Sequence, residues 1–153
     1  MSAAAGFLPK IERLLLLAGA AVLLVVTLWH AAGYVTASIA VANSGLTPDL
    51  KQSFRALWLG FSLQSLVTAL VVLVAALRPR SISAPVLLIC ALLPGLNSAL
   101  LFSFRGSLLG GSLLGLGAFL VIAGAALRPR APRLPAAMPP ANIGSGGATS
   151  ASD

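Results

Sequence analysis

The chain has 153 residues and a formal net charge of +7, and 58% of it is hydrophobic while only 8% is charged. Soluble domains usually carry about 25% charged residues, and one core of this size could not hide so much apolar surface. The composition therefore excludes an ordinary soluble domain and predicts an integral membrane protein. The basic residues stand at the ends of apolar runs and not along one tail, so nucleic acid is not expected as a partner.

Charged residues bound four apolar runs. The uncharged stretches are 35 residues between Arg13 and Asp49, 22 between Arg55 and Arg78, 24 between Arg80 and Arg105, and 22 between Arg105 and Arg128. A transmembrane helix needs about 20 apolar residues, whereas a barrel strand would show about 10 residues of alternating pattern, which is not visible here. We predict an all-α integral membrane four-helix bundle with up-down-up-down topology and spans at about 14–33, 54–77, 83–104 and 106–127.

The first run is too long for one crossing, because 35 helical residues would extend for ~52 Å against a hydrocarbon core of ~30 Å. We expect Tyr34–Ala42 either to continue the helix beyond the bilayer or to lie along its surface. Thr47, Pro48 and Asp49 then predict a helix start near Pro48. An alternative is a cleaved signal peptide ending near Ala42, although the apolar stretch lies unusually far from that site.

The Lys and Arg residues are distributed unequally between the two predicted sides. With four spans, one side holds seven of them (Lys10, Arg13, Arg78, Arg80, Arg128, Arg130 and Arg133) and the other holds three (Lys51, Arg55 and Arg105). The positive-inside rule places the richer side, and both termini, in the cytoplasm. Residues 1–13 form the predicted cytoplasmic N-terminal segment, 14–130 the four-helix domain and 131–153 a disordered cytoplasmic tail rich in Pro, Ala, Gly and Ser.

The second and fourth spans share an internal repeat. Ser53–Arg80 aligns with Ser103–Arg130 at an offset of 50 residues without gaps, and 16 of 28 positions are identical. Both segments begin Ser-Phe-Arg and end Ala-Ala-Leu-Arg-Pro-Arg. The alignment indicates a partial duplication of a helical hairpin, in which the two spans run in the same direction.

Three polar residues within the spans, His30, Gln64 and Asn97, form a candidate polar pocket in the outer half of the bundle. A histidine there could accept a proton or contact a ligand. The competing interpretation is structural. Membrane amides commonly hydrogen-bond between helices, and a neutral histidine can bond a neighbouring helix.

Two further features concern helix shape and packing. Pro94 and Gly95, midway along the third span, predict a kink and a candidate hinge, or else a static bend that helps packing. Small residues recur along the fourth span at Gly110, Gly111, Gly115, Gly117 and Gly124. They predict close helix packing, either in an oligomer interface or inside the same bundle.

We find no sequence pattern of a catalytic, cofactor or metal site. The only acids are Glu12, Asp49 and Asp153, which we place outside the spans, and one His with one Cys cannot form a zinc site. We expect a non-enzymatic accessory or assembly component of a bacterial inner membrane, without cofactor or metal. The alternative is a subunit of a small oligomeric transporter or channel. Expected partners are the lipid bilayer, anionic headgroups at Arg78, Arg80, Arg128 and Arg130, and another copy or another membrane protein.

Overall fold

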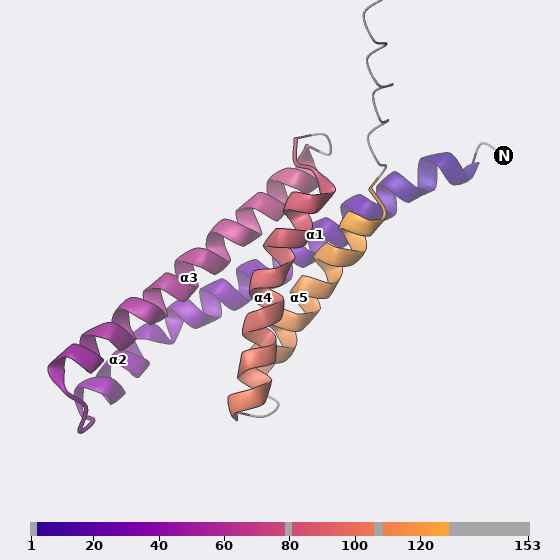
Figure 1. Cartoon of the computed structure of the whole chain (residues 1–153). Helices are drawn as coiled ribbons and strands as arrows, with labels where there is room; N and C mark the ends of the chain where they lie inside the picture. Colours follow the sequence, from indigo (N-terminus) through magenta and orange to yellow (C-terminus); the bar gives the residue numbers. More distant parts are fainter. Residues whose placement is uncertain (1–2, 79–80, 106–108, 129–153) are drawn as a thin grey trace, which may run out of the picture.

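A computed structural model describes residues 3–78, 81–105 and 109–128 of the chain (Figure 1). This part is all-helical and contains five helices: α1 (Ala3–Ala32), α2 (Tyr34–Ala42), α3 (Pro48–Leu77), α4 (Ala84–Arg105) and α5 (Leu109–Ala126). Four segments are long and apolar enough to cross a membrane, and they are Pro9–Ala42, Pro48–Leu77, Ala84–Phe104 and Leu109–Ala126. The prediction of an all-α protein with four membrane-length helices is confirmed. The predicted tail, 131–153, lies outside the described residues.

Helices α1 and α2 form one nearly continuous segment, which accounts for the long first run. The backbone N–H of Gly33 donates to the Trp29 carbonyl, and the N–H of Ala37 donates to the Gly33 carbonyl, so helical bonding continues across the junction. A Cβ on Gly33 would lie 3.4 Å from the Trp58 ring, so a residue without a side chain suits this approach to α3. Tyr34–Ala42 was expected either to continue the first helix or to lie along the membrane surface. In the structure it continues the helix, and α2 packs against α3.

Helix α3 begins at Pro48, as the sequence predicted. Thr47 occupies the N-cap position in an extended conformation, but its side chain makes no capping hydrogen bond. Proline suits the first helical position because that N–H has no helical partner, and Asp49 complements the positive end of the helix dipole. The Lys51 ammonium donates to the Ala42 carbonyl at 2.7 Å. That bond satisfies a carbonyl at the C-terminus of α2 and fixes the turn between the two helices.

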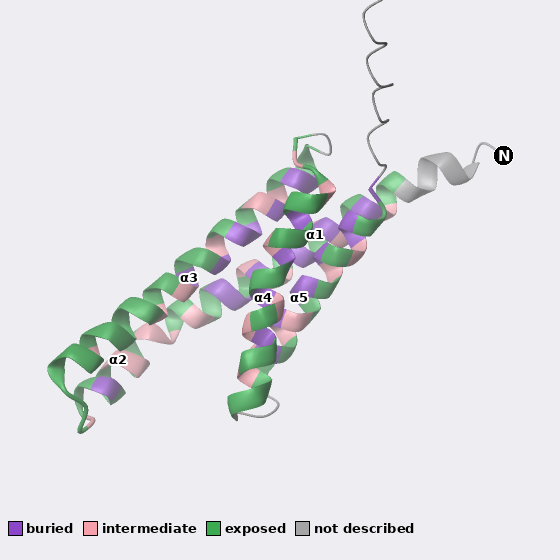
Figure 2. Cartoon of the chain, viewed as in Figure 1, coloured by how far each residue is buried: buried purple, intermediate pink, exposed green. Residues whose placement is uncertain are grey.

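The helices pack in the order α3, α1, α5, α4. Contacts are extensive between α1 and α3, α1 and α5, and α4 and α5, whereas α3 and α4 touch little. The α1–α3 pair and the α4–α5 pair lie together where α3 leads into α4 and diverge away from that end (Figure 1). Buried residues concentrate in the shared half, with Leu16, Leu23, Val72, Leu87 and Val121 at its centre (Figure 2). The bundle is therefore closed at one end and open at the other.

Small residues allow α5 to approach its neighbours closely. A Cβ on Gly117 would lie 2.8 Å from Leu23 Cδ2, and one on Gly124 would lie 2.8 Å from Leu16. On the other side of α5, a Cβ on Gly111 would lie 3.4 Å from Leu101 Cβ, and one on Gly115 would lie 2.9 Å from Ser98 Oγ. Close approach gains dispersion contacts that lipid would not provide.

These contacts lie inside the chain's own bundle, which is the second of the two uses expected for the glycines of the fourth span. Gly110 differs from the other four, because a Cβ there would meet nothing within 4 Å.

The two segments that align in sequence bury different faces of their helices. The buried positions of α3 are Ser62, Ser65, Thr68, Ala69, Val72, Ala75 and Ala76, and those of α5 are Gly111, Leu114, Gly117, Ala118, Val121, Gly124 and Ala125. The buried positions have the same spacing in both helices. Each buried position of α5 lies 49 residues after its counterpart in α3, whereas the two segments align in sequence at an offset of 50 residues. One residue is about 100° of rotation around a helix. Aligned residues of the repeat therefore occupy different environments.

We predict that Gly124→Val destabilises the protein by about 1–3 kcal/mol, because the added methyl groups overpack the contact with Leu16. The measurement is the free energy of unfolding in detergent. Gly110→Val is the matched control, since it adds the same groups in open space on the same helix. Equal stability losses in the two variants would show that the α1–α5 contact is not tightly packed.

Candidate functional site

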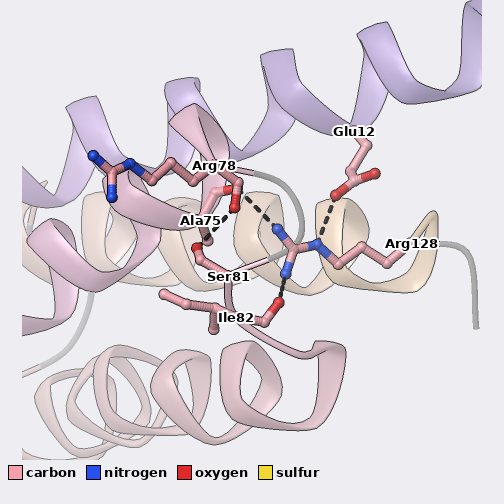
Figure 3. Close-up of polar contacts among 6 residues, drawn as sticks. All are labelled: Glu12, Ala75, Arg78, Ser81, Ile82 and Arg128. Atoms are coloured by element: carbon pink, nitrogen blue, oxygen red, sulfur yellow. Dashed lines mark hydrogen bonds and ion pairs between the residues drawn. The ribbon is translucent and has the colours of Figure 1, made fainter. Parts of the chain in front are cut away.

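Arg128, two residues after the end of α5, makes hydrogen bonds to α1, to α3 and to the turn before α4 at the closed end of the bundle (Figure 3). Its Nε donates to Glu12 Oε1 on α1 at 2.7 Å, and one terminal nitrogen donates to the Ala75 carbonyl of α3 at 2.8 Å. The other terminal nitrogen donates to the Ile82 carbonyl, in the segment that leads into α4. Glu12 is only 5% exposed and Arg128 only 8%. We call Glu12, Arg128 and the two carbonyls the Arg128 junction.

The junction satisfies groups that would otherwise be costly to bury. A carboxylate and a guanidinium removed from water need each other and further hydrogen bonds to offset their lost solvation. The Ala75 carbonyl lies in the last turn of α3, where helix carbonyls lack intrahelical donors, so Arg128 completes the C-terminus of a neighbouring helix. Because a guanidinium has five N–H donors in a planar fork, one side chain can reach three segments.

Sequence reasoning missed this junction. We placed Glu12 in the segment before the first span, whereas the structure has it buried on α1. The available signal was its rarity, because it is one of three acids in the chain and lies beside an apolar run. The rotation between the repeats also explains why Arg78, which aligns with Arg128, is exposed and makes no contact with Glu12.

Among the residues predicted to contact headgroups, Arg78 is exposed, and its contact with lipid stays a prediction. The guanidinium of Arg128 is occupied by protein groups instead. Arg80 and Arg130 lie outside the described residues.

His30 packs between α1 and α3 near the open end of the bundle. Its ring stacks on Trp58 with centroids 4.2 Å apart and lies 4.5 Å from Phe61. Its Nδ1 lies 2.9 Å from the Ser62 hydroxyl, which also donates to the Trp58 carbonyl. The Trp58 indole N–H donates to the His30 carbonyl at 2.9 Å. These contacts match the structural interpretation of His30, a histidine bonded to a neighbouring helix.

The two membrane amides are placed differently from His30. Gln64 is exposed on α3, and Asn97 is half-buried on α4. Ser62 and Gln64 are two residues apart, or about 200° around the helix, so Gln64 points away from the side that meets His30. Within the part of the chain that the structure describes, neither amide group makes a hydrogen bond. The shared pocket of His30, Gln64 and Asn97 therefore stays a prediction, and the polar partner that the structure gives His30 is Ser62.

Helix α4 continues through Pro94, so the candidate hinge at Pro94 and Gly95 lies within regular helix. Pro94 is buried, and a Cβ on Gly95 would lie 3.7 Å from the Ala118 Cβ of α5. Ser98, one turn further on, donates to the Gly111 carbonyl at 2.7 Å and ties α4 to α5. This region packs two helices together, and hinge motion stays a prediction.

Two further findings bear on ligands. A shallow groove of about 490 Å³ lies between α1 and α3, and its lining is almost entirely apolar. It is lined by Thr27, Leu28 and Ala31 of α1 and by Leu59, Gly60, Ser62, Leu63 and Leu66 of α3. Among the described residues, no group of three or more His, Cys, Asp or Glu side chains is placed to hold a metal ion. The groove would suit an acyl chain or an apolar side chain better than a polar solute.

Comparison with known proteins finds no family model that matches this chain, no curated protein and no solved structure with detectable similarity.

We predict that Arg128→Gln lowers the free energy of unfolding by about 3–5 kcal/mol, because it leaves the Glu12 carboxylate buried and unpaired. The measurement is reversible unfolding in detergent. Arg78→Gln is the matched control: it removes one positive charge from the aligned position of the repeat, but from an exposed side chain, and should change stability by less than about 0.5 kcal/mol. Equal losses of unfolding free energy in the two variants would mean that stability depends on the net positive charge and not on the Arg128 junction.

The two tryptophans of the chain provide a second comparison. Trp58→Phe should cost about 1 kcal/mol, because the indole hydrogen bond to the His30 carbonyl is lost. Trp29→Phe should cost less, since Trp29 is 52% exposed and its indole has no hydrogen-bond partner among the described residues. Thermal unfolding in detergent measures both, and a larger loss for Trp29→Phe would contradict the packing of His30.

Proposed function

We propose that this chain is a non-enzymatic polytopic protein of a bacterial inner membrane, an accessory or assembly component that acts through contacts between transmembrane helices. The observation that supports this proposal most strongly is the use of its polar groups. The buried ion pair joins helices, and Ser98 bonds a neighbouring helix backbone. Thr27 and Thr68 bond the preceding turn of their own helices. The ion pair and the Ser98 bond stabilise helix association, the two threonine bonds satisfy hydroxyls within a helix, and the lipid-facing surface is left for partners.

The proposed topology is up-down-up-down, with both termini in the cytoplasm. The Arg128 junction supports it, because Glu12 is near the start of the first crossing, Ala75 is at the end of the second, Ile82 precedes the third and Arg128 follows the fourth. At the opposite end, His30 meets Trp58 and Ser98 meets Gly111. The junction end carries seven of the ten Lys and Arg residues by sequence, which favours the cytoplasmic side. Exposed Arg78 there would contact anionic headgroups.

The second candidate is a subunit of a small oligomeric transporter or channel. The exposed amide of Gln64 and the half-buried amide of Asn97 favour it, because polar groups at membrane depth often mark a solute pathway. In that case the pathway would lie between copies of the chain, where these amides could face one another.

The two candidates predict different results for the purified full-length protein. For an accessory component, cross-linking in native membranes should capture another membrane protein, and proteoliposomes should show no more flux of ions or small solutes than empty liposomes. Solute flux that is lost in the triple variant His30→Ala, Gln64→Ala, Asn97→Ala would contradict this proposal and support the transporter.

Reporter fusions test the topology separately. Reporters at the N-terminus and after residue 153 should both be cytoplasmic, and a reporter inserted at Gly45, in the turn before α3, should be external. Termini on opposite sides would overturn the proposed arrangement.

A further inference from the structure

Gln64 lies at membrane depth, and its amide has no hydrogen-bond partner among the described residues. It is 13 residues before the end of α3 at Leu77, or ~20 Å along the helix, which places it well inside a hydrocarbon core of ~30 Å. The side chain is exposed and makes no hydrogen bond to any residue that the structure describes. Lipid tails offer it no donor or acceptor, so the amide needs a polar partner from another helix.

The residues around Gln64 form an uncovered helix-packing face. Ser53, Leu57, Gly60, Gln64, Val67 and Val71 follow one another at alternating spacings of four and three residues, and all are exposed except Val71, which is half-buried. We call these six residues the Gln64 face. This heptad spacing is the pattern by which helices pair along a continuous line of contact. Gly60, one turn before Gln64, has open space where a Cβ would stand, so a partner backbone can approach closely there.

From the position of Gln64 onward, the same face is already covered in the second aligned segment, whereas Gly110, aligned with Gly60, stays open. At the offset of 50, Gln64, Val67 and Val71 align with Leu114, Gly117 and Val121. Leu114 and Val121 are 1% and 0% exposed, and Gly117 packs against Leu23 of α1. The face of α5 thus binds a helix within the chain, whereas the aligned face of α3 is left without one. The main chemical difference is that α3 has an amide where α5 has leucine.

We propose that the Gln64 face of α3 binds the Gln64 face of a second copy, forming a parallel homodimer about a twofold axis along the membrane normal. Two copies inserted in the same orientation carry Gln64 at the same depth, so each amide supplies the donor and the acceptor that the other lacks. A different partner would need its own polar group at that depth, whereas a second copy related by the twofold axis carries its Gln64 amide at the same depth. This inference goes beyond the proposed function and is independent of it.

Disulfide trapping in native membranes tests the pairing in the full-length chain. Cys90 is the only cysteine, so Cys90→Ala provides a cysteine-free background. In that background Gly60→Cys should form a covalent dimer on mild oxidation, because facing Cα atoms at the axis come within the ~4.4–6.8 Å that a disulfide requires. Leu57→Cys, on the same face, should also cross-link. Gly110→Cys is the matched control, since it occupies the aligned and equally open position of α5 and should stay monomeric.

Substitution of the amide tests its role. Gln64→Leu should raise the dimer dissociation constant in detergent by about 3- to 30-fold, as expected for losing interhelical amide bonds, while Asn97→Leu should leave it unchanged. The proposal is overturned if Gly60→Cys and Leu57→Cys cross-link no better than Gly110→Cys, which would leave lipid or another protein on this face. It is also overturned if Gln64→Leu dimerises as well as the parent chain. These readouts report only self-association, so they are separate from the flux and capture experiments.

Discussion

The ion pair between Glu12 and Arg128, with the two carbonyls that share the guanidinium, is the constraint on which this fold depends. Most of the surface of the four crossings is apolar, and apolar surface is as stable against lipid as against another helix. Burial of hydrophobic side chains therefore cannot by itself determine which helices pack together. A buried carboxylate and guanidinium can determine it, because burying either charge without the other is costly. The junction brings the ends of four crossings together, and the small residues of α5 then determine how closely the helices pack.

The two segments that align in sequence, in α3 and α5, are buried on different faces, and this difference makes the bundle asymmetric. A rotation of one residue relative to the aligned sequences buries Arg128 and leaves Arg78 exposed. The same difference in rotation goes with burial of Leu114 and Val121 on α5 and with exposure of Gln64 and Val67 on α3. One aligned segment thus completes the bundle, and the other leaves the Gln64 face uncovered. This arrangement fits the proposed role as an assembly component, because it combines a closed core with a surface that a partner could cover.

The sequence predicted the parts of this structure that follow from local physics. Charge spacing located the four apolar helices, and Thr47-Pro48-Asp49 located the start of α3, because span length and helix-start chemistry are local properties. The pairing of Glu12 with Arg128 could not be predicted, since it joins residues 116 positions apart and depends on the rotation of each helix. The rotation of α3 could not be predicted either. His30 was therefore grouped with Gln64 from the sequence, and Ser62, which lies on the other side of α3 from Gln64, was missed.

A double-mutant cycle across the junction tests the central claim most directly. Free energies of unfolding in detergent would be measured for the parent chain, Glu12→Gln, Arg128→Gln and the double variant. If the pair holds the bundle, the double variant should be less destabilised than the sum of the single variants by at least about 1 kcal/mol, because the second substitution removes a charge that the first had left unpaired. Effects that add to within about 0.3 kcal/mol would show that Glu12 and Arg128 act independently, and would contradict this account.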